Sequence, residues 1–247
     1  MNNAITALRE KGYGIIPPEQ YLNDMEKDFL TIWNEVKSYT MTSIERGYSL
    51  FKSVEYIVKN KISGDFVECG VWKGGSCMLI AMVLELFKDK DRIIYLYDTY
   101  EGMPKPTKED VISWNGRSVL EKWEEDISGI KDNFGSWAVG LEEVKENIFK
   151  TSYPKGNFIF IPGDVLKTLG TNKPENIALL RLDTDWYAST VKELQVLYPL
   201  IVKRGVLIID DYGHFDGARK AVDEYFKDRP ILLNRIDYTG RIGIKVS

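Results

Sequence analysis

The chain has 247 residues and a mass of 28.4 kDa, which fits a single α/β domain. Hydrophobic residues make up 44% and charged residues 28%, as in ordinary globular proteins, so disordered and fibrous classes are excluded. The net charge is −4 and the basic residues are scattered, which argues against a nucleic-acid partner. The start resembles no secretory signal and no apolar run is long enough to span a bilayer, so we expect a cytoplasmic protein without membrane partners.

The N-terminal part is predicted to be a helical extension covering residues 1–60. Apolar positions recur at steps of three and four in two stretches, 22–36 and 44–58, which is typical of amphipathic helices. Thr42 and Glu45 fit a capping box at the start of the second helix.

The remaining residues, 61–247, are predicted to form the main domain. From residue 65 onward, short apolar runs alternate with helix-sized segments; the runs are DFVECG, IIYLYD, NFIFIPGD, IALLRLD and GVLIIDD. Runs of this kind are typical of parallel strands buried on both faces. The pattern predicts a Rossmann-like, doubly wound, mostly parallel sheet with right-handed crossovers.

Two further segments are added to this pattern. Between the second and third strands, SWAVGLEEVKENIF is predicted to be the crossover helix, which leaves residues 104–135 as an insertion of the kind that forms lids or binding loops. The tail ILLNRIDYTGRIGIKV predicts an antiparallel hairpin at the sheet edge, with its turn at Thr239 and Gly240.

Acidic residues gather where the predicted strands end. They are Glu68, Asp98, Asp164, Asp183, Asp210 and Asp211. Ligands of open α/β sheets lie outside the carboxyl ends of the strands. Each acid alone has an ordinary interpretation as a turn or cap residue. Together they concentrate negative charge, which is costly unless a ligand or cation compensates it.

The first turn, VECGVWKGGS, has glycines between a strand and a very apolar helix, where the backbone can approach a ligand at a helix N-terminus. Its spacing, E-x-G-x-x-x-G, differs from the dinucleotide fingerprint G-x-G-x-x-G. Asp98 ends the next strand, where a carboxylate accepts hydrogen bonds from ribose hydroxyls. Cys69 and Cys77 flank the turn and are expected to be small buried side chains without a disulfide or metal role.

The stretches LRLDTDWYAST and LIIDDYGHF hold the candidate metal ligands. Asp183, Asp210 and Asp211 end two strands that are expected to be neighbours, and three convergent carboxylates suit Mg²⁺ better than zinc. The alternative is that Asp210 caps a helix and Asp211 faces solvent. His214 is either a substrate contact or base, or an ordinary side chain.

Three aromatic residues in the same two stretches also have two interpretations. Trp186, Tyr187 and Tyr212 form either an apolar wall for a sugar ring or part of the core.

Five motifs in order, MTSIERGYSLFKSVEYIV, GDFVECGVWKGGS, YDTYEGMP, LRLDTDWYAST and VLIIDDYGHFDGARKAVDEYF, resemble the macrocin O-methyltransferase (TylF-type) family over roughly residues 40 to 228. The resemblance implies a class I methyltransferase fold, S-adenosylmethionine, Mg²⁺ and methylation of sugar hydroxyls. By position it implies Asp183, Asp210 and Asp211 as metal ligands and Asp183 or Asp185 as general base. The implied cofactor residues are Met41, Thr42, Glu68, Gly70, Ser76, Asp98, Asp164 and Val165. A homodimer is the family-level expectation.

The predicted function is therefore Mg²⁺-dependent methyl transfer from S-adenosylmethionine to a hydroxyl of a deoxysugar, glycoside or nucleotide sugar. Two alternatives remain open: a metal-dependent O-methyltransferase of a catechol or phenol, and a non-catalytic subunit that binds S-adenosylmethionine. A nicotinamide dehydrogenase is disfavoured by the glycine spacing.

Overall fold

A computed structural model describes residues 2–14, 21–127 and 138–246. Its centre is a sheet of seven strands in the order β3-β2-β1-β4-β5-β7-β6. The strands are β1 (Asp65–Cys69), β2 (Ile94–Asp98), β3 (Phe158–Pro162), β4 (Ile177–Leu182), β5 (Ile201–Ile209), β6 (Asn234–Arg235) and β7 (Arg241–Ile244). The first five are parallel, and β7 is antiparallel to β5 and β6. This confirms the predicted fold and its antiparallel C-terminal edge.

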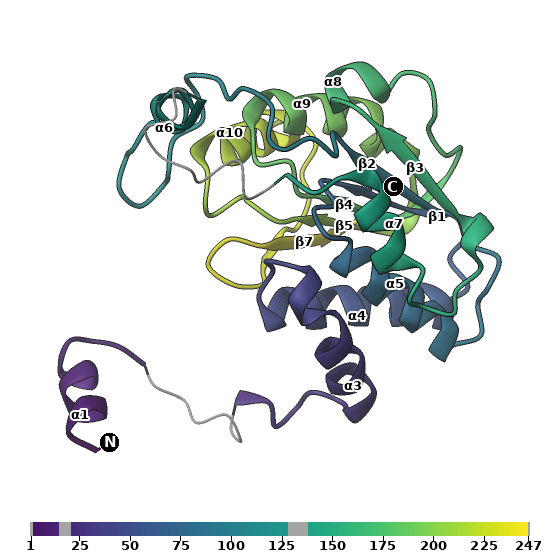
Figure 1. Cartoon of the computed structure of the whole chain (residues 1–247), viewed down its shortest axis with the longest axis horizontal. Coiled ribbons are helices and arrows are strands. Elements are labelled where there is room, and N and C mark those ends of the chain that lie inside the picture. Colours follow the sequence, from purple (N-terminus) through teal and green to yellow (C-terminus); the bar gives the residue numbers. More distant parts are fainter. Residues whose placement is uncertain (1, 15–20, 128–137, 247) are drawn as a thin grey trace.

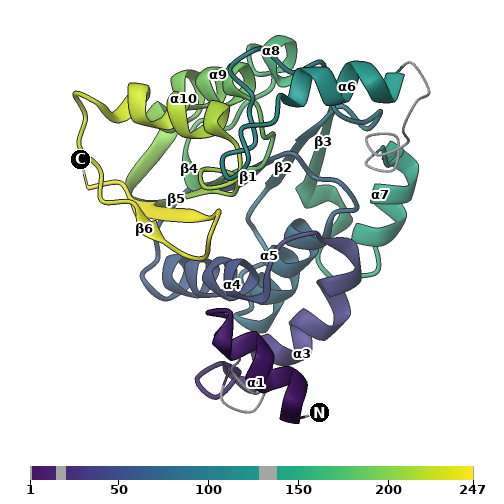
Figure 2. The same ribbon diagram turned by 90° about the vertical axis from the view of Figure 1, so that its left-hand side faces the viewer.

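Helices cover both faces of the sheet (Figures 1 and 2). One face carries α3 (Lys27–Val36), α4 (Ile44–Lys59), α5 (Gly75–Leu86) and α7 (Leu141–Ile148). The other carries α8 (Val165–Thr168), α9 (Tyr187–Val196) and α10 (Asp216–Phe226). The short helix α1 (Asn2–Glu10) lies apart from this body in Figure 1. Within the described ranges, no helix has the length and apolar character needed to cross a membrane.

Successive strand residues enter opposite cores. Phe66 and Leu179 pack with α4 and α5, whereas Val67 and Leu180 pack toward α9 and α10. All four side chains are fully buried. Because both faces of the parallel strands are covered, neither needs polar residues, which explains the near-continuous apolar runs in the sequence.

The N-terminal helices differ from prediction in their boundaries. The stretch 44–58 does form a helix, α4, but α3 starts at Lys27, after the first apolar positions of its predicted stretch. The Thr42 capping box is wrong: Ser43 is the N-cap, and its Oγ accepts the Arg46 N–H over 3.2 Å. Ser43 also donates to Asp237, which fixes its hydroxyl at the helix start. The domain division at residue 60 stays a prediction.

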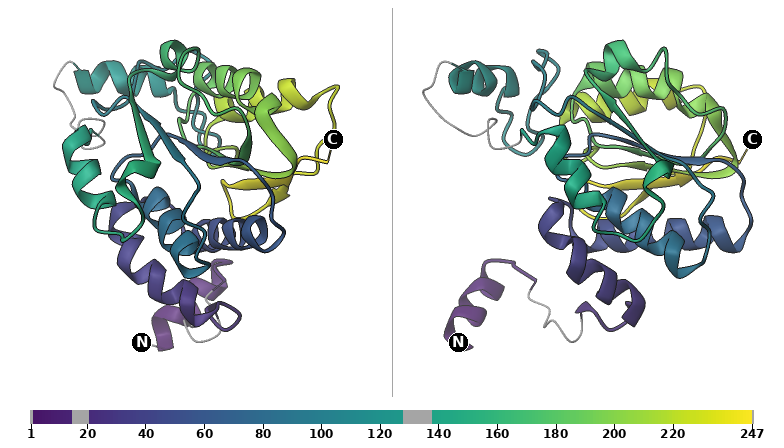
Figure 3. Two further views of the ribbon diagram at one scale, coloured as in Figure 1. Left: turned by 90° about the vertical axis from the view of Figure 1, so that its right-hand side faces the viewer. Right: turned by 45° about the vertical axis from the view of Figure 1, so that its right-hand side comes forward.

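The described part of the insertion lies against α9 and α10. A short bridge joins Val111 to Ser118, and a second joins Ile112 to Phe215. The helix α6 (Val119–Ile127) follows and projects beyond the sheet (Figure 3). Residues 128–135 of the predicted insertion lie outside the described residues. The crossover helix is confirmed, although α7 begins only at Leu141.

Candidate active site

Strand register brings the acids of the sheet edge together. Glu68 on β1 pairs with Arg181 on β4, which pairs with Ile208 on β5. Past the strand ends, the Asp183 N–H donates to the Cys69 carbonyl over 2.8 Å, and the Asp210 N–H donates to the Leu182 carbonyl over 2.9 Å. The predicted neighbourhood of the two acid-bearing strand ends is thus confirmed.

Gly70 allows the ends of β1 and β4 to meet. Its φ of +84° is accessible to glycine at little cost, and a Cβ there would lie 1.9 Å from the Asp183 carbonyl oxygen. The glycine-rich turn then closes around Asp98, whose Oδ2 accepts the N–H groups of Val71 and Trp72 over 2.6 and 3.1 Å. Asp98 therefore organises the loop as well as facing the cavity that it lines.

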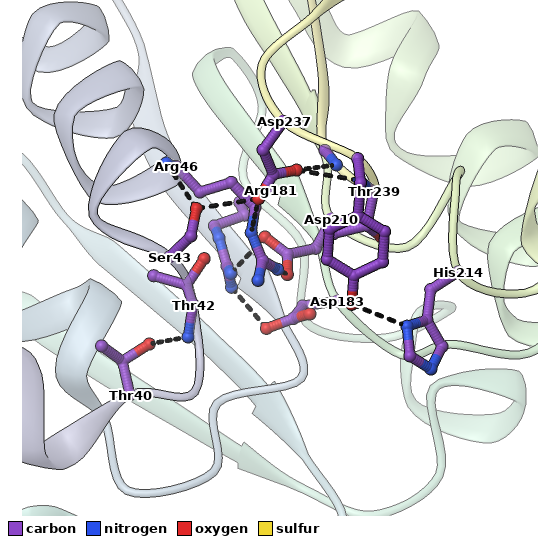
Figure 4. A network of polar contacts seen from close by, with 12 residues as sticks. Thr40, Thr42, Ser43, Arg46, Arg181, Asp183, Asp210, His214, Asp237 and Thr239 are labelled. Atoms are coloured by element: carbon purple, nitrogen blue, oxygen red, sulfur yellow. Dashed lines mark hydrogen bonds and ion pairs between the residues drawn. The ribbon is translucent and has the colours of Figure 1, made fainter. Parts of the chain in front are cut away.

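A buried guanidinium, that of Arg181, joins three of the acids; Figure 4 shows its contacts with Asp183 and Asp210. Arg181 is only 3% exposed and pairs with Glu68, Asp183 and Asp210, the last two over 2.6 Å. Arg46, from α4, pairs with the other oxygen of Asp210 and, over 3.0 Å, with Asp237. Both oxygens of Asp210 therefore accept from arginines.

A second cluster is formed by Asp183, Asp185 and Asp211, which offer carboxylate oxygens within 4.8 Å of one another. Asp211 Oδ2 is buried and has no hydrogen-bond partner among the described residues. Asp185 has a left-handed φ of +67°, which is uncommon for a residue with a Cβ. Burial is the main cause that raises the pKa of each of these three acids, and the neighbouring negative charges raise it further.

These carboxylates face a cavity of about 250 Å³. Among the predicted cofactor residues, the lining includes Met41, Thr42, Glu68, Gly70, Ser76 and Asp98. Asp164 and Val165 line an adjoining cavity that shares Gly70, Asp98 and Asp183 with the first. Two polar atoms of residues lining the first cavity, Thr42 Oγ1 and Trp72 Nε1, are buried without a partner within the described part of the chain. Such atoms indicate a ligand that would satisfy them.

Two ordinary interpretations from the sequence also hold. Asp164 caps α8 by accepting the Leu166 N–H over 2.9 Å. Cys69 and Cys77 are free and buried, and the Cys77 thiol donates to Glu68 over 2.6 Å. Both cysteines are thus buried side chains, as the sequence predicts.

Of the two interpretations of Trp186, Tyr187 and Tyr212, the core interpretation is confirmed for Trp186, and none of the three lines the cavity. Trp186 is buried in a small core with Phe215. The two tyrosine hydroxyls donate to acids of α10, Glu224 and Asp223, over 2.7 and 2.8 Å. They point away from the cavity because exposed carboxylates on the neighbouring helix bind their polar ends.

The rings that do line the cavity include those of His214 and Tyr238. The His214 Nδ1 lies 3.0 Å from the Tyr238 hydroxyl. Burial, and then the positive charge of Arg46, lower the pKa of His214, so the ring is neutral near pH 7.

This edge combines a glycine-rich turn, an acid after the second strand and a carboxylate cluster in a sheet of order 3-2-1-4-5-7-6. The macrocin-O-methyltransferase (TylF) family model matches residues 20–242. The chain belongs to this family. Membership makes it an O-methyltransferase that uses S-adenosylmethionine.

Related proteins agree with the family. Demethyldecarbamoylnovobiocin O-methyltransferase of Streptomyces niveus is 32% identical over 188 residues, covering 76% of this chain and 68% of the relative. A tetracenomycin-type 4'-O-methyltransferase of Streptomyces olivaceus, whose substrate name includes a dimethoxy-rhamnosyl group, is 32% identical over 210 residues, covering 84% and 76%. The solved structure of the O-methyltransferase NovP has a TM-score of 0.73 and 31% identity, covering 85% of this chain and 83% of that one.

Sequence reasoning missed three residues of this TylF-family site, namely Arg46, Arg181 and Tyr238. Arg181 had a usable signal, since it is the one basic residue of the apolar run IALLRLD, and buried charges are normally paired. Arg46 and Tyr238 had no such signal in the sequence. Arg46 lies on the polar side of a predicted helix, and Tyr238 lies in a predicted turn. Their place in the site depends on long-range packing of α4 and the β6–β7 turn.

Proposed function

We propose that the enzyme methylates a sugar hydroxyl with the help of Mg²⁺, and that the sugar is part of a natural product or surface glycan. The proposal rests on one observation: the carboxylates of Asp183, Asp185 and Asp211 line the same cavity as most of the predicted cofactor residues. The relative from Streptomyces olivaceus, whose substrate name includes a rhamnosyl group, supports the sugar class.

The residues present fit a divalent cation. Six carboxylates lie at this edge, those of Glu68, Asp183, Asp185, Asp210, Asp211 and Asp237, against the two arginines Arg46 and Arg181, so negative charge remains after the ion pairs are counted. The donors are all oxygens, which suits Mg²⁺. The buried and unpartnered Asp211 Oδ2 is a free ligand atom in this set.

The proposed ligands are Asp183, Asp210 and Asp211, with Asp185 as general base. A divalent cation bound there would lower the pKa of a coordinated hydroxyl. Asp185 is suited to accept the proton because burial raises its pKa and its carboxylate lies within the same cluster. For Asp210 to serve as a ligand, one of its arginine contacts must be exchanged; Asp185 is the alternative third ligand, because it already lies in the cluster.

The cavity walls have their own part in catalysis. Glu68, Asp98 and the glycine turn would hold S-adenosylmethionine, while His214 and Tyr238 would orient the sugar. Methyl transfer forms a bond from the sugar oxygen to the methyl carbon as the bond from that carbon to sulfur breaks, leaving S-adenosylhomocysteine. Alignment of the two reactants supplies a large part of the rate gain.

The test uses metal-stripped enzyme, S-adenosylmethionine and a panel of methyl and aryl glycosides that includes rhamnosides, with catechol as the phenol alternative. Turnover is measured as S-adenosylhomocysteine formed, with and without Mg²⁺. We expect Mg²⁺-dependent methylation of a glycoside. Methylation of catechol alone would move the function to the phenol class, and turnover that is insensitive to chelation would remove the metal.

Four variants distinguish the metal ligands from the general base. Asp183→Asn, Asp210→Asn and Asp211→Asn should lose the calorimetric Mg²⁺ signal, whereas Asp185→Asn should keep it and lose turnover by at least roughly a hundredfold. All should still bind the cofactor. Asp228→Asn, which changes an exposed acid, is the matched control. Loss of Mg²⁺ binding in Asp185→Asn, with binding retained in Asp210→Asn, would make Asp185 the third ligand.

A further inference from the structure

Trp114 is a large apolar side chain left exposed beside the cavity. It lies between the bridge partners Val111 and Ser118, and it is 62% exposed. Its ring meets the His214 ring edge to face, with 4.5 Å between centroids. His214 lines the cavity, so Trp114 lies one ring further out from the acids. A single exposed apolar residue is ordinary, but a tryptophan that extends a cavity wall indicates a binding surface.

The backbone around Trp114 is anchored. The Ser113 N–H donates to the His214 carbonyl over 3.0 Å, and the Ser113 hydroxyl donates to Asp216 over 2.8 Å. Ile112 forms a bridge with Phe215 on the same segment. The exposed ring is therefore presented by a fixed turn that binds the cavity-lining segment directly, and ordering it on ligand binding costs little entropy.

Two other exposed apolar side chains border the cavity. Met41 is 57% exposed and Tyr238 is 53% exposed, and both line it. The Tyr238 and His214 rings lie 6.0 Å apart. The rings of Trp114, His214 and Tyr238 thus follow one another beside the cavity and give this wall an aromatic surface, and Met41 adds an exposed apolar side chain to the lining.

The charge of this region disfavours a phosphate. Arg46 is the one cation among the described residues of the lining, and Asp210 and Asp237 already bind it. Lys122, on α6, lies close enough to contribute to the lowered pKa of His214, after burial and Arg46, but it does not line the cavity. A diphosphate normally requires free cations or helix N-terminal N–H groups. An uncharged group suits the surface better.

We infer that Trp114, with His214 behind it, forms an acceptor subsite for a flat, uncharged apolar ring joined to the methylated sugar. The inference rests on the proposed function and specifies its substrate further. With the reacting hydroxyl at the carboxylates, the sugar ring lies beside His214 and Tyr238. The next ring along the acceptor then reaches Trp114.

The test compares three forms of the sugar that the glycoside panel identifies: its methyl glycoside, its 2-naphthyl glycoside and its dTDP conjugate. For the wild type we expect a lower KM for the naphthyl form than for the methyl form. Trp114→Ala should raise the naphthyl KM roughly fivefold to tenfold, with kcat and the methyl-glycoside KM unchanged. Trp114→Phe should keep most of the preference. Leu232→Ala, which shortens an exposed apolar side chain outside the cavity lining, is the control.

The outcomes separate the inference from the function on which it rests. A wild type that methylates no sugar of the panel defeats the proposed function, and the inference falls with it. A wild type that methylates sugars, combined with a Trp114→Ala variant that changes both glycosides equally or neither, defeats only the subsite. A KM for the dTDP conjugate below that of the naphthyl glycoside also overturns it.

Discussion

The Thr184 hydroxyl donates to Glu193 Oε1 over 2.8 Å, which connects the loop between two candidate catalytic acids to a carboxyl group at the centre of the protein. Thr184 stands between Asp183 and Asp185. Glu193, on α9, has no exposed surface, and its Oε2 lacks a partner among the described residues. Burial raises the pKa of Glu193 to about 8, so the group is mostly protonated near pH 7.

Glu193 predicts a specific pH dependence of stability. Its folded pKa of about 8 lies above its ordinary value of 4.5, so between these values the unfolded chain has lost a proton that the folded chain keeps. Stability therefore falls as pH rises through that window. The side chain of Glu193→Gln stays neutral at every pH. The Tm of this variant minus that of the wild type should therefore increase by about 5 °C as the pH rises from about 5.5 to about 8.

The measurement is thermal unfolding across this pH range, with the exposed Glu175→Gln as control. The control should follow the wild type at every pH. A constant Tm difference between wild type and Glu193→Gln would show that the carboxyl does not titrate as described. Equal turnover of the two proteins at low pH would show that neutral hydrogen bonding is enough to hold the Asp183–Asp185 loop.

Gly70 should be replaceable by no other residue. Gly70→Ala combines a positive φ with a Cβ placed against the Asp183 carbonyl, so we expect aggregation or a loss of several kcal/mol, together with loss of cofactor binding. Gly116 also has a positive φ, but a Cβ there meets nothing within 4 Å. Gly116→Ala should therefore cost only about 1–2 kcal/mol of backbone strain.

Urea unfolding and titration of S-adenosylmethionine distinguish these two variants. If Gly70→Ala behaves like Gly116→Ala in both measurements, the close approach of β1 and β4 is not required for the site.

Local sequence patterns decide some features of this protein, and tertiary contacts decide others. Strand runs, the hairpin and the acids after β4 and β5 follow from local signals, namely short apolar runs and the residues that end them, and the structure confirms them. The start of α4 was misplaced by one residue because Ser43 gains a second bond from a residue 194 positions away. Tertiary contacts of this kind leave no mark in a single sequence.

The choice between wall and core for Trp186 stayed open for a similar reason. Trp186 follows a strand and could face either the core or the cavity, and the sequence alone does not fix which side the chain takes after the strand ends. The left-handed conformation of Asp185 immediately before it turns the chain, and Trp186 then packs on Phe215. The insertion supplied Trp114 instead, from a stretch without a periodic pattern.

Arg181 is predicted to be essential for stability. Arg181→Met removes the cation that Glu68, Asp183 and Asp210 share, leaving buried negative charge uncompensated. Loss of one member of a buried ion pair costs about 3–5 kcal/mol. Adding Glu68→Gln to this variant should restore part of the loss, because it removes one of the unpaired charges.

Urea unfolding measures both effects. Arg117→Met is the matched control: it breaks an exposed pair with Glu125 and should cost less than about 1 kcal/mol. Equal effects of the two single variants would mean that the buried network contributes no more than a surface pair.

Thr42 should increase the affinity for the cofactor and lower the stability of the enzyme without cofactor. Its Oγ1 is buried and unpartnered in the described structure, which costs free energy until a ligand bonds it. Thr42→Val keeps the shape and removes the hydroxyl, so the Tm without cofactor should stay equal or rise slightly. The Kd for S-adenosylmethionine should increase about threefold to tenfold, the value of one hydrogen bond. Thr42→Ser, which keeps the hydroxyl, is the control and should bind S-adenosylmethionine nearly as the wild type does.

The two variants together decide the role of Thr42. A higher Kd in both would assign the loss of affinity to the methyl group, and an unchanged Kd in Thr42→Val would remove Thr42 from the cofactor site.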